Sequence, residues 1–270
     1  MKIHANGIAM NYELAGEGHC LAFIHGAGDN LHMWYNQVPA FSQRYRVLTY
    51  DVRGFGETEL PEGELSMTLL AEDLYDLLRA LRMEGAFVLG YSMGGRIALE
   101  LALAHPEMVT ALVLANSGVG AGPRTPEAEE RRRTLLSLLE KGDLETVAEQ
   151  MTVNSFSPGF KDRNPEAFQR YKEVKLRNDP RGFARLWGAL VTAAAPDLSR
   201  LSCPTLIIAG ERDSFIAMEA AQAVQAAIPG SRLEVLPTGH AAAIEAPRDF
   251  NRIVLDFLAD VVRTTGAGRP

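Results

Sequence analysis

The stretch of residues 86–102 constrains the fold of this chain more than any other. An apolar run at residues 86–89 leads into the turn Gly90-Tyr91-Ser92-Met93-Gly94, and the residues after the turn have the composition of a buried helix. This order predicts a strand, a tight turn and a helix. A serine at such a turn has a strained backbone and needs small neighbours, which the glycines at 90, 94 and 95 supply. Ser92 is therefore a candidate nucleophile; the alternative is a glycine-rich connection with an incidental serine.

The length and the net charge of the chain limit the number of domains and the kinds of partner that can be expected. With 270 residues, of which 47% are hydrophobic, the chain can bury one large core, and α/β folds of this length commonly form a single domain. The formal net charge of -7 argues against a nucleic-acid partner, because neutralising phosphates requires clustered Lys and Arg. The run Arg131-Arg132-Arg133 is flanked by glutamates and is typical of a solvated helix face.

The cysteines and the N-terminal residues indicate the cellular environment of the protein. Cys20 and Cys203 form neither a metal-binding pair nor a disulfide framework, which favours a reducing, cytoplasmic environment. Residues 1–10 contain no long apolar segment, so we expect neither a signal peptide nor membrane insertion. The sequence has no Gly-x-Gly-x-x-Gly after a strand and no Gly-Lys-Ser/Thr, so we expect chemistry without a cofactor.

Predicted strands and helices alternate along most of the chain. A hairpin is expected at residues 3–6 and 8–14, and further strands at 21–24, 47–50, 86–89, 109–114, 205–209 and 232–236. Helical patterns occur at 33–42, from Ser66 as N-cap to 81, at 93–105, 218–227 and 250–258. This alternation predicts a mainly parallel sheet with helices on both faces.

The alternation breaks after the strand at residues 109–114. Helical segments at 126–139, 144–151, 165–177 and 183–194 follow one another with turn signals between them and without a convincing strand. We therefore expect a core domain of residues 1–117 and 197–270, interrupted by a helical cap of residues 118–196.

A serine hydroxyl is a weak nucleophile, so it needs a base, an acid that orients the base, and donors for the oxyanion. Among the six histidines, His240 lies in a loop just after a predicted strand and is the predicted base. Asp213, which follows the preceding strand, is the predicted acid, with Glu211 as the alternative. The competing interpretations are a surface histidine and an acid that only stabilises a helix start.

Backbone amides are the expected oxyanion donors. One is the N–H of Met93, the residue after the nucleophile. The other is expected from the loop His25-Gly26-Ala27-Gly28, with the Ala27 N–H as the candidate. The His25 ring is expected to tie this loop to the neighbouring backbone rather than to transfer protons.

These features occur in a particular order: His25-Gly26, Asp51-x-Arg53-Gly54-x-Gly56, Ser92, a helical insertion after the sixth core strand, Asp213 and His240. In this order they resemble the α/β-hydrolase superfamily over nearly the whole chain, and the branch of small esterases, enol-lactone hydrolases and cofactor-free haloperoxidase-like members in particular. The resemblance implies an α/β-hydrolase fold: an eight-stranded, mostly parallel sheet with an antiparallel second strand, flanked by helices, a Ser-His-Asp triad and an inserted helical cap. Haloalkane dehalogenases and epoxide hydrolases carry aspartate where this chain has Ser92, which argues against those activities.

The expected function is hydrolysis of a small-molecule carboxylic ester or lactone through an acyl-enzyme on Ser92. Residues that are candidates to line a substrate pocket, although each is also explained by core packing, are Gly28, Trp34, Tyr91, Phe156, Phe160 and Trp187.

An alternative function depends on Arg96. The segment Gly90-Tyr91-Ser92-x-Gly94-Gly95-Arg96 is similar to that of pyruvate-eliminating synthases of menaquinone biosynthesis, in which the arginine holds a polyanionic substrate. In plain esterases the same arginine is expected to form a structural ion pair. Candidate additional arginines for a polyanion are Arg124, Arg131 to Arg133, Arg181 and Arg185. Carbon–carbon bond hydrolysis stays open because a triad does not specify the bond, whereas pure ligand binding gives no reason for the whole set to coexist.

Overall fold

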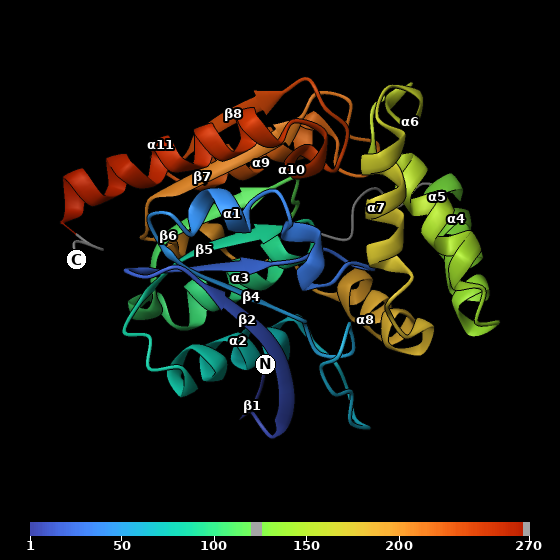
Figure 1. Cartoon of the computed structure of the whole chain (residues 1–270), viewed down its shortest axis with the longest axis horizontal. Helices are drawn as coiled ribbons and strands as arrows, with labels where there is room; N and C mark the ends of the chain where they lie inside the picture. The colour runs from blue at the N-terminus through green and yellow to red at the C-terminus, as the bar shows by residue number, and fades with distance from the viewer. Residues whose placement is uncertain (120–125, 267–270) are drawn as a thin grey trace.

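The protein, described here by a computed structural model for residues 1–119 and 126–266, is built around one eight-stranded sheet (Figure 1). The strand order is β1-β2-β4-β3-β5-β6-β7-β8. The strands are β1 (Lys2–Ala5), β2 (Ile8–Ala15), β3 (Cys20–Ile24), β4 (Arg46–Tyr50), β5 (Ala86–Tyr91), β6 (Val109–Ala115), β7 (Thr205–Gly210) and β8 (Arg232–Leu236). Strand β2 pairs antiparallel with β1 and β4, and the other neighbouring strands pair in parallel. The predicted sheet, with its antiparallel second strand, is confirmed.

Helices cover both faces of the sheet because the central strands are apolar on both sides. In β3, Leu21 and Phe23 pack into one hydrophobic cluster, whereas Ala22 and Ile24 pack into the other, and β5 alternates in the same way. The first cluster is completed by α1 (Val38–Phe41) and α11 (Pro247–Thr265). The second is completed by α2 (Met67–Ala80), α3 (Met93–Ala104) and α9 (Met218–Ala227).

Local sequence signals fix several helix ends. The Ser66 hydroxyl accepts a hydrogen bond from the Leu69 N–H at 3.0 Å, so Ser66 caps α2 as predicted. Helix α3 stops before Pro106, which begins the short 3-10 turn η2 (Pro106–Met108).

Five helices lie between β6 and β7, beyond the carboxyl ends of the parallel strands (Figure 1). They are α4 (Pro126–Glu140), α5 (Leu144–Ser155), α6 (Phe160–Arg163), α7 (Pro165–Lys175) and α8 (Pro180–Thr192). Within the described part of residues 116–204 no strand is present, in agreement with the sequence pattern. The 3-10 turn η3 (Leu198–Arg200) leads back into the sheet.

The sequence pattern missed or misjudged the shortest elements. Residues 33–42 form the turn η1 (Leu31–Trp34) and the separate helix α1 instead of one helix. Asn30 caps η1 through its side chain, and Pro39 lacks the N–H that a continuous helix would use. The four-residue helices α6 and α10 (Ala242–Glu245) were not predicted.

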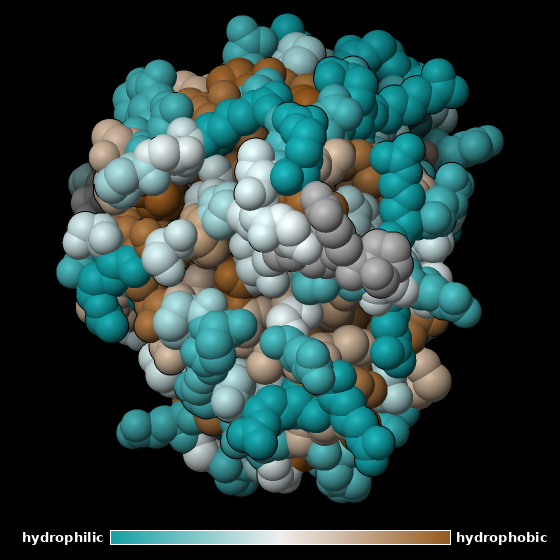
Figure 2. Space-filling model, turned by 90° about the vertical axis from the view of Figure 1, so that its left-hand side faces the viewer, coloured by the Kyte–Doolittle hydropathy of each residue, from teal (hydrophilic) through white to brown (hydrophobic). Residues whose placement is uncertain are grey.

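The side of the molecule opposite the inserted helices is shown in Figure 2, where hydrophilic side chains surround small hydrophobic patches. Over residues 1–119 and 126–266, no helix combines the length and the apolar character that crossing a membrane requires. Across the same residues, no group of three or more His, Cys, Asp or Glu side chains is arranged to hold a metal ion.

Candidate active site

Ser92 lies at the turn between β5 and α3. Its backbone conformation, with φ of 52° and ψ of -116°, is one that residues other than glycine rarely adopt. The turn is possible because the residues two positions before and two positions after Ser92 are glycines. A Cβ on Gly90 would lie 2.2 Å from the Gly94 carbonyl oxygen, and one on Gly94 would lie 2.3 Å from the Ile24 carbonyl oxygen. The sequence therefore places the Ser92 side chain at the carboxyl edge of the sheet, as the strand-turn-helix pattern predicts.

Three side chains from distant parts of the chain meet at this edge. The Nε2 atom of His240 lies 2.9 Å from the Ser92 Oγ, and its Nδ1 atom lies 2.8 Å from the Asp213 Oδ2. Because a carboxylate only accepts hydrogen bonds, Nδ1 donates to Asp213, and Nε2 is left to accept the proton of the Ser92 hydroxyl. The arrangement can raise the nucleophilicity of Ser92.

Asp213 is almost fully enclosed, with 2% of its side chain exposed. Its Oδ1 accepts the N–H groups of Phe215 and Ile216 at 2.8 and 3.0 Å, and its Oδ2 also accepts from the Asn116 side chain at 3.1 Å. Burial raises the pKa of the Asp213 carboxyl, but the charge and hydrogen bond of His240 and the two amides outweigh burial, so the pKa is lowered. The carboxyl is thus ionised at neutral pH.

Glu211, the alternative acid, is exposed to solvent, and its backbone N–H donates to the Leu236 carbonyl at 2.8 Å. The structure brings Asp213, and not Glu211, to the His240 ring.

The two segments that carry the candidate oxyanion donors are packed against each other. Met93 is the first residue of α3, so its N–H belongs to the first helical turn, where amides have no partner within the helix. Ala27 lies in the loop after β3, whose backbone touches the Gly94 backbone. The His25 ring braces this loop: its Nδ1 donates to the Gly26 carbonyl at 2.8 Å, and its Nε2 accepts the Val52 N–H at 2.9 Å. Burial lowers the pKa of His25, which favours the neutral ring that makes both contacts.

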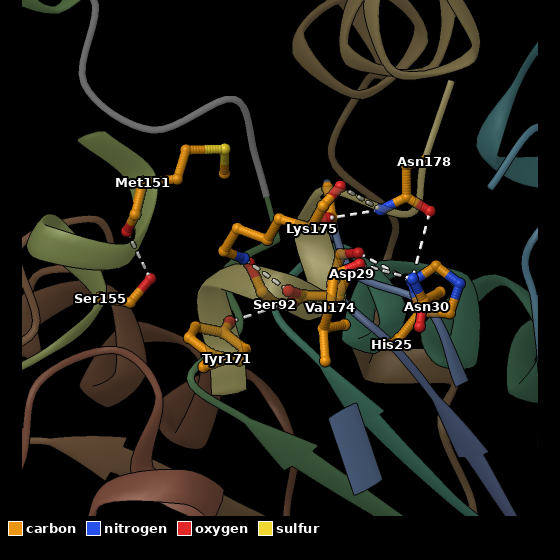
Figure 3. A network of polar contacts seen from close by, with 12 residues as sticks. His25, Asp29, Asn30, Ser92, Met151, Ser155, Tyr171, Val174, Lys175 and Asn178 are labelled. Atoms are coloured by element: carbon orange, nitrogen blue, oxygen red, sulfur yellow. Dashed lines mark hydrogen bonds and ion pairs between the residues drawn. The ribbon is translucent and has the colours of Figure 1, made fainter. Parts of the chain in front are cut away.

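A buried polar network that sequence reasoning missed lies beside Ser92's neighbour, Tyr91. The Tyr91 and Tyr171 hydroxyls are 3.3 Å apart. Tyr171 donates to Asp29 Oδ2 at 3.1 Å, and the Lys175 Nζ lies 2.5 Å from Asp29 Oδ1 (Figure 3). A signal was present in the sequence, because Lys175 shares the apolar face of its helix with Tyr171 and Phe168. Burial, together with the nearby Asp29 charge, raises the pKa of Tyr91 and of Tyr171 well above the ordinary value.

The candidate pocket residues fall into two groups. Trp34 is fully buried and stacks on Phe23 with ring centroids 4.8 Å apart, so it belongs to the core. Phe156 and Phe160 stack on each other at 4.1 Å, and Trp187 packs edge-on against Phe183.

The other candidates lie nearer to the triad. The Tyr91 ring is 5.1 Å from the His240 ring. Gly28 has φ of +78°, and a Cβ on it would lie 2.8 Å from the Phe183 ring, so this glycine lets the loop approach α8 closely. The backbone of Phe156 touches Gly239, the residue before His240.

Arg96 is held by protein groups. Its Nε and Nη2 donate to Glu100 Oε1 at 3.2 and 2.5 Å, its Nη1 donates to the Val119 carbonyl at 2.7 Å, and its Nη2 also donates to the Ala194 carbonyl at 2.5 Å.

The other arginines considered for a polyanion are spread apart. Arg185 donates to the carbonyls of Pro61 and Gly63, Arg181 pairs with Asp179, Arg132 and Arg133 pair with glutamates of their own helix, Arg131 is exposed on that helix, and Arg124 lies outside the described residues.

Comparison with known proteins defines the class of this one. Residues 21–247 match the sequence model of the alpha/beta hydrolase fold family. The chain is 32% identical over 253 residues to 3-oxoadipate enol-lactonase 2 of Acinetobacter baylyi, with 93% of each chain covered. The protein belongs to the alpha/beta hydrolase fold family and is a hydrolytic enzyme.

Solved structures of an esterase and of an enol-lactonase are similar to this protein over nearly the whole chain. A thermophilic esterase from Thermogutta terrifontis superposes with a TM-score of 0.88 at 27% identity, covering 97% of this chain and 98% of that one. The enol-lactonase from Burkholderia xenovorans superposes with a TM-score of 0.89 at 27% identity, covering 96% and 100%. The predicted resemblance to the esterase and enol-lactone hydrolase branch is confirmed.

Proposed function

We propose that the protein hydrolyses carboxylic esters, lactones included, through an acyl-enzyme on Ser92. The observation that carries this proposal is the pair of contacts made by His240, at 2.9 Å to the Ser92 Oγ and 2.8 Å to the Asp213 Oδ2. A nucleophile, a base and an orienting acid in hydrogen-bonding contact are an arrangement that catalyses acyl transfer.

The reaction begins when the Ser92 Oγ attacks the acyl carbon and His240 Nε2 takes the hydroxyl proton. The negative charge that develops on the carbonyl oxygen is stabilised by the amides of Ala27 and Met93. The ester C–O bond then breaks, and His240 returns the proton to the leaving alcohol. Water, activated by the same ring, attacks the acyl-enzyme and releases the acid.

Asp213 acts throughout as a fixed anion. It keeps the proton on His240 Nδ1 and stabilises the imidazolium while Nε2 holds the serine proton. Its lowered pKa supports this role, because the carboxyl stays ionised at neutral pH.

We further propose that residues 118–196 form a cap over the site, carried by a core of residues 1–117 and 197–270. The Ser155 carbonyl of α5 accepts the Ala241 N–H at 2.8 Å, so an inserted helix contacts the loop that carries His240. Glu245 links the same two segments, because its carboxylate accepts the Gly239 N–H at 2.9 Å and is hydrogen-bonded to the Ser157 hydroxyl. Substrate selection is expected to depend on this insertion.

The contacts of Arg96 favour ester hydrolysis over elimination from a polyanion. The synthase alternative requires an arginine that faces the substrate, whereas the guanidinium of Arg96 donates to Glu100 and to two backbone carbonyls. Esters with a small, uncharged acyl group are therefore the substrates that we test first.

The test is hydrolysis of short p-nitrophenyl esters and of a small lactone. We expect turnover by the wild type, and Ser92→Ala and His240→Ala are each expected to lower kcat by about 10³-fold or more. Ser199→Ala, at an exposed serine in η3, is the matched control and should keep full activity. A folded wild type that cleaves none of these substrates, or a Ser92→Ala variant that keeps its activity, contradicts the proposal.

A further inference from the structure

The loop of residues 26–31 carries the Ala27 amide and is held from one side by a single helix. Tyr171, Val174 and Lys175 of α7, with Asn178 just after it, follow the i, i+3, i+4, i+7 spacing that places residues on one face of a helix. All four contact this loop, as Figure 3 shows.

The Asp29 carboxylate receives the strongest of these contacts. The Lys175 Nζ lies 2.5 Å from one oxygen, and the Tyr171 hydroxyl donates to the other at 3.1 Å. The side chains of Lys175 and Asp29 are 3% and 1% exposed. Both charges are thus withdrawn from water and compensate each other, and a carboxylate bonded through both oxygens has a fixed orientation.

The residues on either side of Asp29 are bound to α7 and to Asn178, just after α7. The Asn178 side chain donates to the Gly28 carbonyl at 2.8 Å, and the Asn30 side chain donates to the Val174 carbonyl at 2.7 Å. Three consecutive loop residues, directly after Ala27, are therefore bound to α7 or to Asn178 just after it.

The same contacts extend to the nucleophile turn. Tyr171 reaches the hydroxyl of Tyr91, the residue before Ser92, at 3.3 Å. A Cβ on Gly26 would lie 2.8 Å from the Tyr91 ring and 3.0 Å from Asp29 Oδ2, so the Asp29 carboxylate lies against the start of the loop. A shift of Asp29 would consequently be transmitted to the backbone at Gly26 and Ala27.

A buried ion pair is an uncertain source of stability, because the loss of hydration offsets most of the attraction between the charges. The effect of such a pair on catalysis, through the position of the groups it holds, can be larger. A misplacement of about 1 Å in a catalytic group can lower the rate about 100-fold.

We propose that Lys175 is a positioning residue that acts through Asp29 to hold the oxyanion-hole loop in its reactive geometry. The inference rests on the proposed function, because it assigns the Ala27 amide to the oxyanion. Helix α7 then belongs to the catalytic framework, even though none of its side chains touches the reacting atoms.

The experiment compares two substitutions of the same kind on one helix. Lys175→Met removes the charge that binds Asp29 and keeps the length of the side chain. Lys172→Met is the matched control, because the Lys172 Nζ pairs with Glu145 and Glu149 of α5, at 2.6 and 2.9 Å, away from the loop. We expect Lys175→Met to lower kcat by about 10- to 100-fold with a change in KM below about 3-fold, and Lys172→Met to change neither.

Hydrogen exchange of the amides in residues 26–31 gives a second readout that needs no substrate. We expect it to accelerate in Lys175→Met, with the sheet strands unchanged, and to stay at the wild-type rate in Lys172→Met. This readout separates the two proposals, since it reports on the loop even if no ester is hydrolysed.

If Lys175→Met does not fold because Asp29 is left unpaired, the double variant Asp29→Asn with Lys175→Met removes both buried charges. The double variant is expected to show the same faster loop exchange and lower kcat. Loop exchange and kcat within about 2-fold of wild type in a folded variant, or exchange that accelerates equally throughout the chain, overturns the proposal.

Discussion

At the scale of single residues, the site depends on the hydrogen bonds that each polar atom makes. Both oxygens of Asp213 are used, Oδ1 by two backbone amides and Oδ2 by His240 and Asn116. The charge and hydrogen bond of His240, together with the two amides, lower the pKa of the carboxyl in spite of burial, so the carboxylate that faces His240 is ionised and negatively charged at neutral pH. The tautomer of His240 follows directly from that charge.

Replacing Asp213 should therefore have a far larger effect than replacing its acidic neighbour. Asp213→Asn keeps the shape but offers the ring an amide in place of an anion, and we expect kcat to fall by about 10³- to 10⁴-fold. Glu211→Gln changes an exposed side chain, and we expect kcat within about 2-fold of wild type. Steady-state ester hydrolysis measures both. A large effect at Glu211 with a small one at Asp213 would reverse the assignment.

Sequence reasoning could reach Ser92, Asp213 and His240 because each follows a predicted strand, and parallel strands end at one edge of a sheet. It could not identify the contact between Asp29 and Lys175, although the place of Lys175 on the apolar face of its helix was a signal. Their pairing joins residues that are 146 positions apart through the packing of α7 on the loop, and neither periodicity nor spacing encodes that contact.

At the scale of elements, Arg96 joins the two ends of the insertion to α3. Its guanidinium binds the Val119 carbonyl, shortly after β6, and the Ala194 carbonyl, shortly after α8. These two carbonyls lie near the two ends of the insertion, and Arg96 itself is in the second turn of α3. One side chain thus fixes both connections to the helix that starts at the nucleophile turn.

The role of Arg96 can be separated from substrate binding. Arg96→Met leaves Glu100 and two carbonyls without their donor, and we expect the free energy of unfolding to fall by about 3 kcal/mol. Hydrolysis of neutral and carboxylate-bearing esters should change by the same factor. Denaturant unfolding and parallel kinetics on both ester types measure these effects.

The control for this variant is Arg252→Met, which removes an exposed arginine from α11 and should leave stability unchanged. A loss confined to carboxylate-bearing esters in Arg96→Met would instead place Arg96 at the substrate.

Element prediction succeeded where a pattern is long enough to have a period. The strands have alternating or continuous apolar runs and the long helices have three- to four-residue apolar repeats, and the structure contains all of these elements. Helices α6 and α10 have four residues each, about one turn, which is too short for a repeat to appear. Their formation depends on the surrounding chain, as shown by the contact of the Ser157 N–H, before α6, with the Glu245 carboxylate at the end of α10.

At the scale of the whole molecule, the parallel sheet converts separate loops into one site. The loops after β3, β5, β7 and β8 provide Ala27, Ser92, Asp213 and His240, respectively, and the inserted helices lie beyond the same edge (Figure 1). The strand ends carry the proposed reactive groups, while α5 contacts the loop that carries His240 and α7 contacts the loop that carries Ala27. The inserted helices are in this way connected to the loops of the proposed active site.

The central claim is that Ser92 is the residue that becomes acylated, and covalent labelling tests it most directly. A p-nitrophenyl phosphonate ester, followed by intact-mass and peptide mass spectrometry, should give one adduct per chain, located on Ser92. His240→Ala should slow the labelling, and Ser92→Ala should abolish it. An unlabelled wild type, or an adduct on another serine such as Ser117, whose hydroxyl lies 2.8 Å from the Ser92 carbonyl, would contradict the account.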